Sequence, residues 1–172
     1  MLVGPFVDER SPGKISSEGT MSTSSVHPPE AAEVLLVEDN PNDLELTLRA
    51  LRQSKVAVSV RVVRDGAEAM EHLYPAGRGI KRTGKSTLKL IILDLKLPKV
   101  DGIELLKKIK SNELTHLIPV VVLTSSREEK DVLQSYQYGA SSYVVKPVEF
   151  EKFIDTVSSL GIYWTSLNQP PL

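Results

Sequence analysis

The sequence contains no cysteine, so neither a disulfide framework nor a thiolate metal site is available to it. Lys and Arg number 21 against 22 Asp and Glu, and this balance gives no basic surface of the kind that binds nucleic acid. No apolar run approaches the roughly 18 residues of a membrane span, and the N-terminus lacks the pattern of a secretory signal. These absences predict a cytoplasmic protein that binds neither nucleic acid nor membranes.

The N-terminal segment has little apolar periodicity and is rich in Ser, Pro, Gly and Glu. Such a segment buries too little apolar surface to offset the entropy of ordering, so residues 1–33 are predicted to be a disordered extension. Because Met21 begins a second natural-looking start, residues 1–20 are either an artificial leader or an upstream extension. One domain is expected over residues 34–162, followed by a C-terminal extension at 163–172.

From Val34 onward, short apolar runs alternate with segments of helical period, which is typical of βαβ units around a parallel sheet. The runs predicted to be strands are residues 34–37, 58–63, 90–93, 120–123 and 143–145. Five helices are expected after them. The spacing of Val132, Leu133 and Tyr136 predicts the apolar face of the fourth helix, and residues 150–160 carry the clearest apolar stripe.

Polar residues follow four of these strands at their carboxyl ends: Glu38 and Asp39, then Asp94, Thr124 and Lys146. The carboxyl ends of parallel strands meet at one edge of the sheet, so these side chains are expected to converge. Carboxylates at close range repel, and a set of oxygen ligands without Cys or His selects a hard cation, most plausibly Mg²⁺. Asp94, at the end of the central strand, is then the best candidate for a nucleophile toward phosphorus.

The same residues carry a family resemblance. Val-Glu-Asp-Asn at 37–40, Leu-Asp-Leu-Lys-Leu-Pro at 93–98, the Thr-Ser pair at 124 and the Lys-Pro pair at 146 resemble a response-regulator receiver domain over about residues 34–160. The resemblance implies a flavodoxin-like, doubly wound α/β fold: a five-stranded parallel sheet of order 2-1-3-4-5 with helices on both faces. It also implies a two-component phosphorelay protein that receives a phosphoryl group from a histidine kinase and thereby switches partner binding.

The resemblance further implies a role for each site residue. Asp94 is the phospho-acceptor, which Lys146 and Thr124 assist by holding the phosphoryl group. Tyr143 is the aromatic residue that changes rotamer together with a shift of Thr124. The implied metal ligands are Glu38 through water, Asp39, Asp94 and the backbone carbonyl of Lys96. Loss of the phosphoryl group by slow self-hydrolysis is expected, so the protein is not an enzyme in the ordinary sense.

A narrower resemblance concerns the Glu-Asp-Asn-Pro-x-Asp start at 38–43, the long segment before the third strand and the Leu-Gly-Ile-Tyr-Trp ending at 160–164. These features are similar to those of phytochrome-associated single-domain regulators. That similarity implies a phytochrome-type histidine kinase as partner and a homodimer, neither of which follows from residue spacing. Tyr163 and Trp164 leave two interpretations open, an interface or a cover for the end of the core.

The sequence argues against three other functions. Residues 79–86 fit a P-loop expression, but they precede a strand instead of leaving one for a helix, which disfavours nucleotide binding. A phosphatase of the dehalogenase type needs a second Asp two residues after the nucleophile, where this chain has Lys96. A degenerate receiver that only binds partners is disfavoured because every chemical position is filled.

Overall fold

The computed structural model describes residues 32–54, 58–74 and 88–169. Its strands are β1 (Ala32–Val37), β2 (Val58–Val63), β3 (Leu88–Leu93), β4 (Val120–Thr124) and β5 (Ser142–Val145). Its helices are α1 (Pro41–Gln53), α2 (Gly66–Leu73), α3 (Gly102–Ser111), α4 (Glu129–Gln137), α5 (Phe150–Ile162) and a short π-helix, η1 (Tyr163–Leu167). The P-loop-like residues 79–86 and residues 1–31 lie outside the described part of the chain.

The five strands form one parallel sheet in the order β2-β1-β3-β4-β5, which confirms the predicted fold class. The chain runs outward from β1 to β2 and then crosses to β3 on the other side of β1. The order therefore reverses between β1 and β3, which is the place where open α/β sheets bind ligands. A candidate site is thus expected at the carboxyl ends of these two strands.

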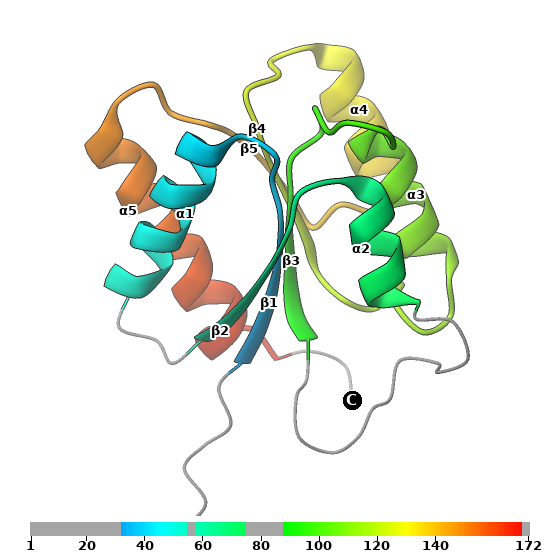
Figure 1. The fold of residues 1–172 in the computed structure, drawn as a ribbon, viewed down its shortest axis with the longest axis horizontal. Helices are drawn as coiled ribbons and strands as arrows, with labels where there is room; N and C mark the ends of the chain where they lie inside the picture. Colours follow the sequence, from blue (N-terminus) through cyan, green and yellow to red (C-terminus); the bar gives the residue numbers. More distant parts are fainter. Residues whose placement is uncertain (1–31, 55–57, 75–87, 170–172) are drawn as a thin grey trace, which may run out of the picture.

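Two apolar layers fix the helices to the sheet, with α1 and α5 on one face and α2, α3 and α4 on the other (Figure 1). Successive residues of a strand point to opposite faces. Val34 and Leu36 accordingly pack in the cluster with Phe153 and Val157 of α5, whereas Leu35 packs in the cluster with α2 and α3. Continuous apolar runs are required because both faces are covered.

The first strand begins earlier than predicted. Ala32 pairs with Val58 and Glu33 pairs with Ser59, so the last two residues of the segment predicted to be disordered belong to the sheet. The strand β2 supplies hydrogen-bond partners for their backbone groups. The composition of residues 1–33 alone does not predict this pairing with a strand farther along the chain.

The spacing of Leu133 and Tyr136 correctly predicts the helix α4, but both side chains are exposed, at 59% and 52%. Ser135 is the buried residue of this helix. Phe150, which belongs to the apolar stripe of α5, is also exposed and lies 5.1 Å under the Arg49 guanidinium. Both helices flank β5, an edge strand, where a helix has less sheet to cover and can leave apolar side chains in solvent.

The residues after α5 continue the helix as η1. Trp164 packs against the core cluster of α1 and α5, so it covers the end of the core, while Tyr163 is exposed and its role at an interface stays a prediction. Among the described residues, no helix combines the length and apolar character needed to cross a membrane.

Candidate functional site

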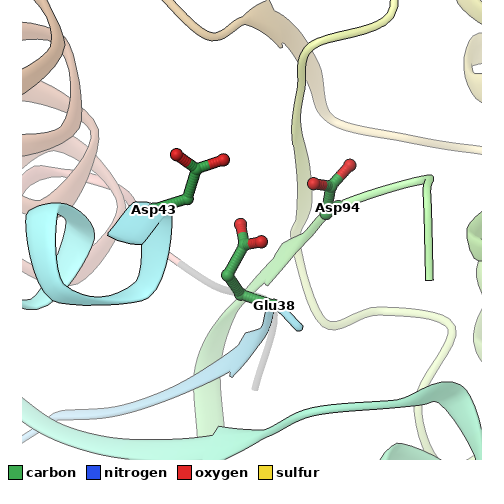
Figure 2. A group of neighbouring side chains, drawn as sticks. All are labelled: Glu38, Asp43 and Asp94. Carbon is green, nitrogen blue, oxygen red and sulfur yellow. The ribbon is translucent and has the colours of Figure 1, made fainter. Parts of the chain in front are cut away.

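Side chains from three separate segments converge at the carboxyl edge of the sheet. Glu38 follows β1, Asp94 follows β3 and Asp43 lies in the first turn of α1. Figure 2 shows their carboxyl groups arranged around a common space, and one oxygen from each lies within 4.8 Å of the others. Neighbouring backbones hold the strand ends in register, because the Asp94 amide donates to the Val37 carbonyl at 3.1 Å.

Lys146, which follows β5, joins these carboxylates. Its ammonium group donates to Asp94 Oδ2 at 2.6 Å, to Glu38 Oε2 at 2.7 Å and to Asp43 Oδ2 at 2.7 Å. An ammonium group has three N–H donors, so each of them is matched with a different carboxylate. Lys146, Glu38 and Asp94 are buried, and a buried charge is tolerated only when it is paired in this way.

The sequence after β1 places Asp43 in this arrangement. The Asn40 side chain caps α1 by accepting from the amides of Asn42 and Asp43, and Pro41 occupies the first helical position. The Asn40 amide in turn donates to Glu38 Oε1 at 3.1 Å. The first turn of α1 is therefore tied to the end of β1, and the Asp43 side chain is brought to the strand ends.

The electrostatics of the site follow from burial and from these bonds. Burial raises the pKa of Glu38 to about 7, although its contacts with Lys146 act in the opposite direction. Burial alone lowers the pKa of Lys146, but its hydrogen bonds to Asp43, Asp94 and Glu38 outweigh burial and hold that pKa above its ordinary value. The lysine is therefore a permanent cation at the centre of the site.

The loop after β3 supports Asp94. The amide of Lys96 donates to Asp94 Oδ1 at 3.1 Å, while the Lys96 side chain extends into solvent. Gly102 begins α3 directly against this loop, since a Cβ at that position would lie 2.5 Å from the Asp94 carbonyl oxygen. Only glycine permits such a close approach between two backbones.

A second polar cluster lies beside the site at the start of α4. Buried Thr124 accepts from the Ser126 amide at 3.3 Å, and the Tyr143 hydroxyl donates to the Ser126 carbonyl at 3.1 Å. The Ser126 hydroxyl donates to Asp131 in the first turn of α4 at 2.5 Å. Thr124 and Tyr143 thus both form a hydrogen bond with Ser126, and Ser126 forms another with Asp131 of α4.

The structure brings together most of the residues singled out in the sequence. Glu38, Asp94 and Lys146 are in direct contact, and Thr124 ends the adjacent strand β4 at the same edge. Asp39 is half-buried and is not a member of the carboxylate group. Asp43 is a member that the sequence analysis missed, and the signal that points to it is its place three residues after the helix cap.

The donor set suits a hard divalent cation. Glu38, Asp43 and Asp94 offer carboxylate oxygens only, and no sulfur ligand exists in the chain. Above pH 7, where Glu38 is ionised, three negative charges face the one positive charge of Lys146, and the net excess of two matches a doubly charged ion.

Comparison with known proteins identifies the family. The profile of the response regulator receiver domain matches residues 34–158, and the chain belongs to this family. The protein is a receiver-domain response regulator of two-component signalling, and the predicted class of function is confirmed.

Its relatives include regulators associated with phytochromes. Rcp1 of Synechocystis sp. is 36% identical over 138 residues, which cover 80% of this chain and 90% of Rcp1, and the crystal structure of its Mn²⁺-bound form aligns with a TM-score of 0.72. The phosphorylated cyanobacterial phytochrome response regulator RcpA is 37% identical, covers 83% of this chain and 99% of its own, and aligns with a TM-score of 0.73. The bacteriophytochrome response regulator RtBRR is 50% identical, with coverages of 82% and 84% and a TM-score of 0.63.

Proposed function

We propose that Asp94 accepts a phosphoryl group from a histidine kinase and that the mark switches the binding of partners. The observation that carries this proposal is the contact of Asp94 Oδ2 with the buried ammonium group of Lys146, at the point where the strand order reverses. A carboxylate nucleophile beside a permanent cation is suited to phosphoryl transfer, in which charge on the phosphoryl oxygens must be neutralised. RcpA, a relative of known structure, is itself phosphorylated.

In this transfer the phosphoryl group passes from a histidine nitrogen of the kinase to a carboxylate oxygen of Asp94. A carboxylate oxygen of Asp94 attacks phosphorus, the bond from phosphorus to the histidine nitrogen breaks, and the nitrogen keeps the electron pair. Lys146 and the Thr124 hydroxyl donate to phosphoryl oxygens of the resulting acyl phosphate. Slow hydrolysis follows when water attacks phosphorus and the Asp94 carboxylate leaves, which releases inorganic phosphate.

We infer that Mg²⁺ is the cation of this site. Asp94 and the carbonyl of Lys96 are its proposed direct ligands, and Glu38 is proposed to act through water. Asp43, which lies in the same carboxylate group, is a further candidate ligand, and Asp39 remains a predicted direct ligand although it is not a member of that group. Bound Mg²⁺ neutralises charge on the transferring phosphoryl group. Oxygen donors and the Mn²⁺-bound form of the relative Rcp1 support a divalent ion.

The proposed switch uses the cluster at the start of α4. When the Thr124 hydroxyl turns to the phosphoryl group, it releases the Ser126 amide, and the bonds of Ser126 to Tyr143 and Asp131 readjust. Leu133 and Tyr136 are exposed on α4, so a shift of this helix is proposed to change the binding preference of the face that contains α4, β5 and α5.

The direct test is incubation of the full chain with acetyl phosphate and Mg²⁺, followed by intact mass spectrometry. A single phosphoryl adduct that requires Mg²⁺ and decays after removal of the donor is expected. Failure to form the adduct at saturating donor and Mg²⁺ contradicts the proposal, and turnover of generic phosphate esters indicates a phosphatase instead.

The raised pKa of Glu38 predicts that Mg²⁺ binds more weakly as the pH falls through about 7. Protonation removes the negative charge with which Glu38 attracts the hydrated cation, so the Kd measured by calorimetry is expected to rise by about tenfold between pH 8 and pH 6. Glu38→Gln should flatten this dependence. A wild-type Kd that does not change with pH contradicts the assignment of Glu38.

The same pKa fixes the sign of a stability effect. The folded pKa of Glu38, about 7, lies above its ordinary value of 4.5, so between these values the folded protein holds a proton that the unfolded chain releases. This contribution to stability is fully present below pH 4.5 and is lost as the pH rises through about 7. Urea unfolding without metal at pH 5 and pH 8 measures it.

The partner proposed for Asp94 is a phytochrome-type histidine kinase, in line with the names of RcpA and RtBRR, and a cytoplasmic location of this protein is also proposed. We also propose a homodimer, supported by the exposed side chains of Tyr163 and Leu167 on η1. Light scattering is expected to give twice the chain mass for the wild type and the chain mass for the double variant Tyr163→Ser, Leu167→Ser. Leu114→Ser, an exposed leucine elsewhere, is the control. A wild type that stays monomeric with and without phosphodonor contradicts the dimer.

A further inference from the structure

Asp43 occupies the third N–H donor of the lysine that the proposed phosphotransfer needs. Its carboxylate lies 2.7 Å from Lys146 Nζ, the same distance as that of Glu38 and within 0.1 Å of that of Asp94. The lysine therefore has no free donor for an incoming phosphoryl oxygen. One of the three carboxylates must release it before the phosphoryl group can be held.

Asp43 is the carboxylate best placed to do so. Its side chain is 31% exposed, whereas the side chains of Glu38 and Asp94 are 2% and 7% exposed. A released Asp43 can be solvated by water, but a released Glu38 would be left buried and unpaired, which is far more costly. Glu38 is also held at its other oxygen by the Asn40 amide.

We infer that Asp43 is a positioning residue that restrains Lys146 in the unphosphorylated protein and slows phosphorylation of Asp94. The inference rests on the proposed function of Asp94. Asp43 acts in two ways: it competes with the phosphoryl group for a donor of Lys146, and its charge opposes the approach of a phosphoryl dianion. It also adds a third carboxylate to the cation site, so it strengthens metal binding while it delays transfer.

Asp43 is thus expected to raise the affinity for metal and to lower the rate of phosphorylation, and both effects can be measured. In Asp43→Asn, the rate constant for phosphorylation by acetyl phosphate at saturating Mg²⁺ is expected to rise by about tenfold, which corresponds to a barrier lowered by roughly 1.4 kcal/mol. The Mg²⁺ affinity of the same variant is expected to fall severalfold. Asp43→Glu, which keeps the charge, should restore both quantities toward the wild-type values.

One further variant and two further measurements complete the test. Glu45→Gln removes an exposed carboxylate from the same helix and is expected to leave the rate constant unchanged. Urea unfolding of each variant shows whether the domain remains folded, and the NMR signal of the Lys146 ammonium group reports its partners directly. A change in that signal in Asp43→Asn, together with faster transfer, supports the restraint.

The outcomes separate the inference from the proposed function. If the wild type is phosphorylated and Asp94→Asn is not, but Asp43→Asn reacts at the wild-type rate or more slowly, the restraint is wrong and the function stands. An equal acceleration in Glu45→Gln also overturns the restraint, because it reduces the effect to net charge. If the wild type is never phosphorylated, the proposed function itself fails.

Discussion

Asp94→Asn is expected to abolish phosphorylation completely, because the amide oxygen that remains is not a nucleophile toward phosphorus under the same conditions. Intact mass spectrometry after incubation with acetyl phosphate and Mg²⁺ should show one adduct on the wild type and none on the variant. The substitution is close to isosteric, and the amide can still accept a hydrogen bond from Lys146, which contacts this residue at 2.6 Å in the wild type. Loss of the adduct is therefore attributable to chemistry and not to the fold.

The control for this experiment is Asp155→Asn, which neutralises an exposed aspartate on α5. It is expected to form the adduct at the wild-type rate. Since one of the close carboxylates is lost in Asp94→Asn, its Mg²⁺ affinity should also fall by roughly tenfold or more. A phosphoryl adduct that survives in Asp94→Asn places the acceptor on another residue and contradicts the assignment.

Lys146→Met is expected to have the largest effect on stability. It removes the only cation found in contact with Glu38, Asp43 and Asp94 among the described residues, so mutually repelling carboxylates are left at a largely buried site. Breaking a buried ion pair on one side typically costs about 3–5 kcal/mol. The free energy of unfolding, measured in urea at pH 8 without metal, should fall by roughly this amount.

The same variant should respond strongly to Mg²⁺ and to pH. A divalent cation replaces part of the lost positive charge, so added Mg²⁺ is expected to raise stability more in Lys146→Met than in the wild type. A lower pH should also raise the stability of Lys146→Met, since protonation of Glu38 relieves the repulsion between the carboxylates. Phosphorylation of Asp94 is expected to slow by roughly 10²–10³-fold, as when one preorganised donor to a developing anion is removed.

Lys110→Met is the matched control for lysine removal. The Lys110 ammonium group is half-buried and donates to the backbone carbonyls of His116 and Ile118, which are neutral acceptors. Lys110→Met should lower the free energy of unfolding by less than Lys146→Met does, and added Mg²⁺ should not change its stability. If Lys146→Met behaves like this control, the lysine does not balance the charge of the site.

The fold followed closely from local pattern. Unbroken apolar runs such as Leu90–Leu93 mark strands covered on both faces, and both apolar layers observed in the structure require them. The start of the first strand did not follow from local pattern, because Ala32 and Glu33 become part of a strand only through pairing with Val58 and Ser59. The exposure of Leu133 was also missed, since helical spacing defines an apolar stripe without saying how much sheet there is to cover.

The candidate site was predictable where it depends on strand ends. Glu38, Asp94 and Lys146 follow parallel strands, and parallel strands present their carboxyl ends at one edge. Asp43 was not predicted, because its participation depends on the angle at which α1 leaves β1. The Asn40 cap and the contact of Asn40 with Glu38 set that angle.

The sequence by itself determined the layered α/β architecture, the edge at which polar residues gather and the identity of the candidate acceptor, Asp94. Residue spacing and strand order are enough for these, since they require only that apolar runs be buried and that strands be parallel. Only the tertiary structure decided how the three donors of Lys146 are shared. Hydrogen-bond partners depend on separations of a few tenths of an ångström between groups as distant in sequence as Glu38 and Lys146, and those separations are set by packing across the whole sheet.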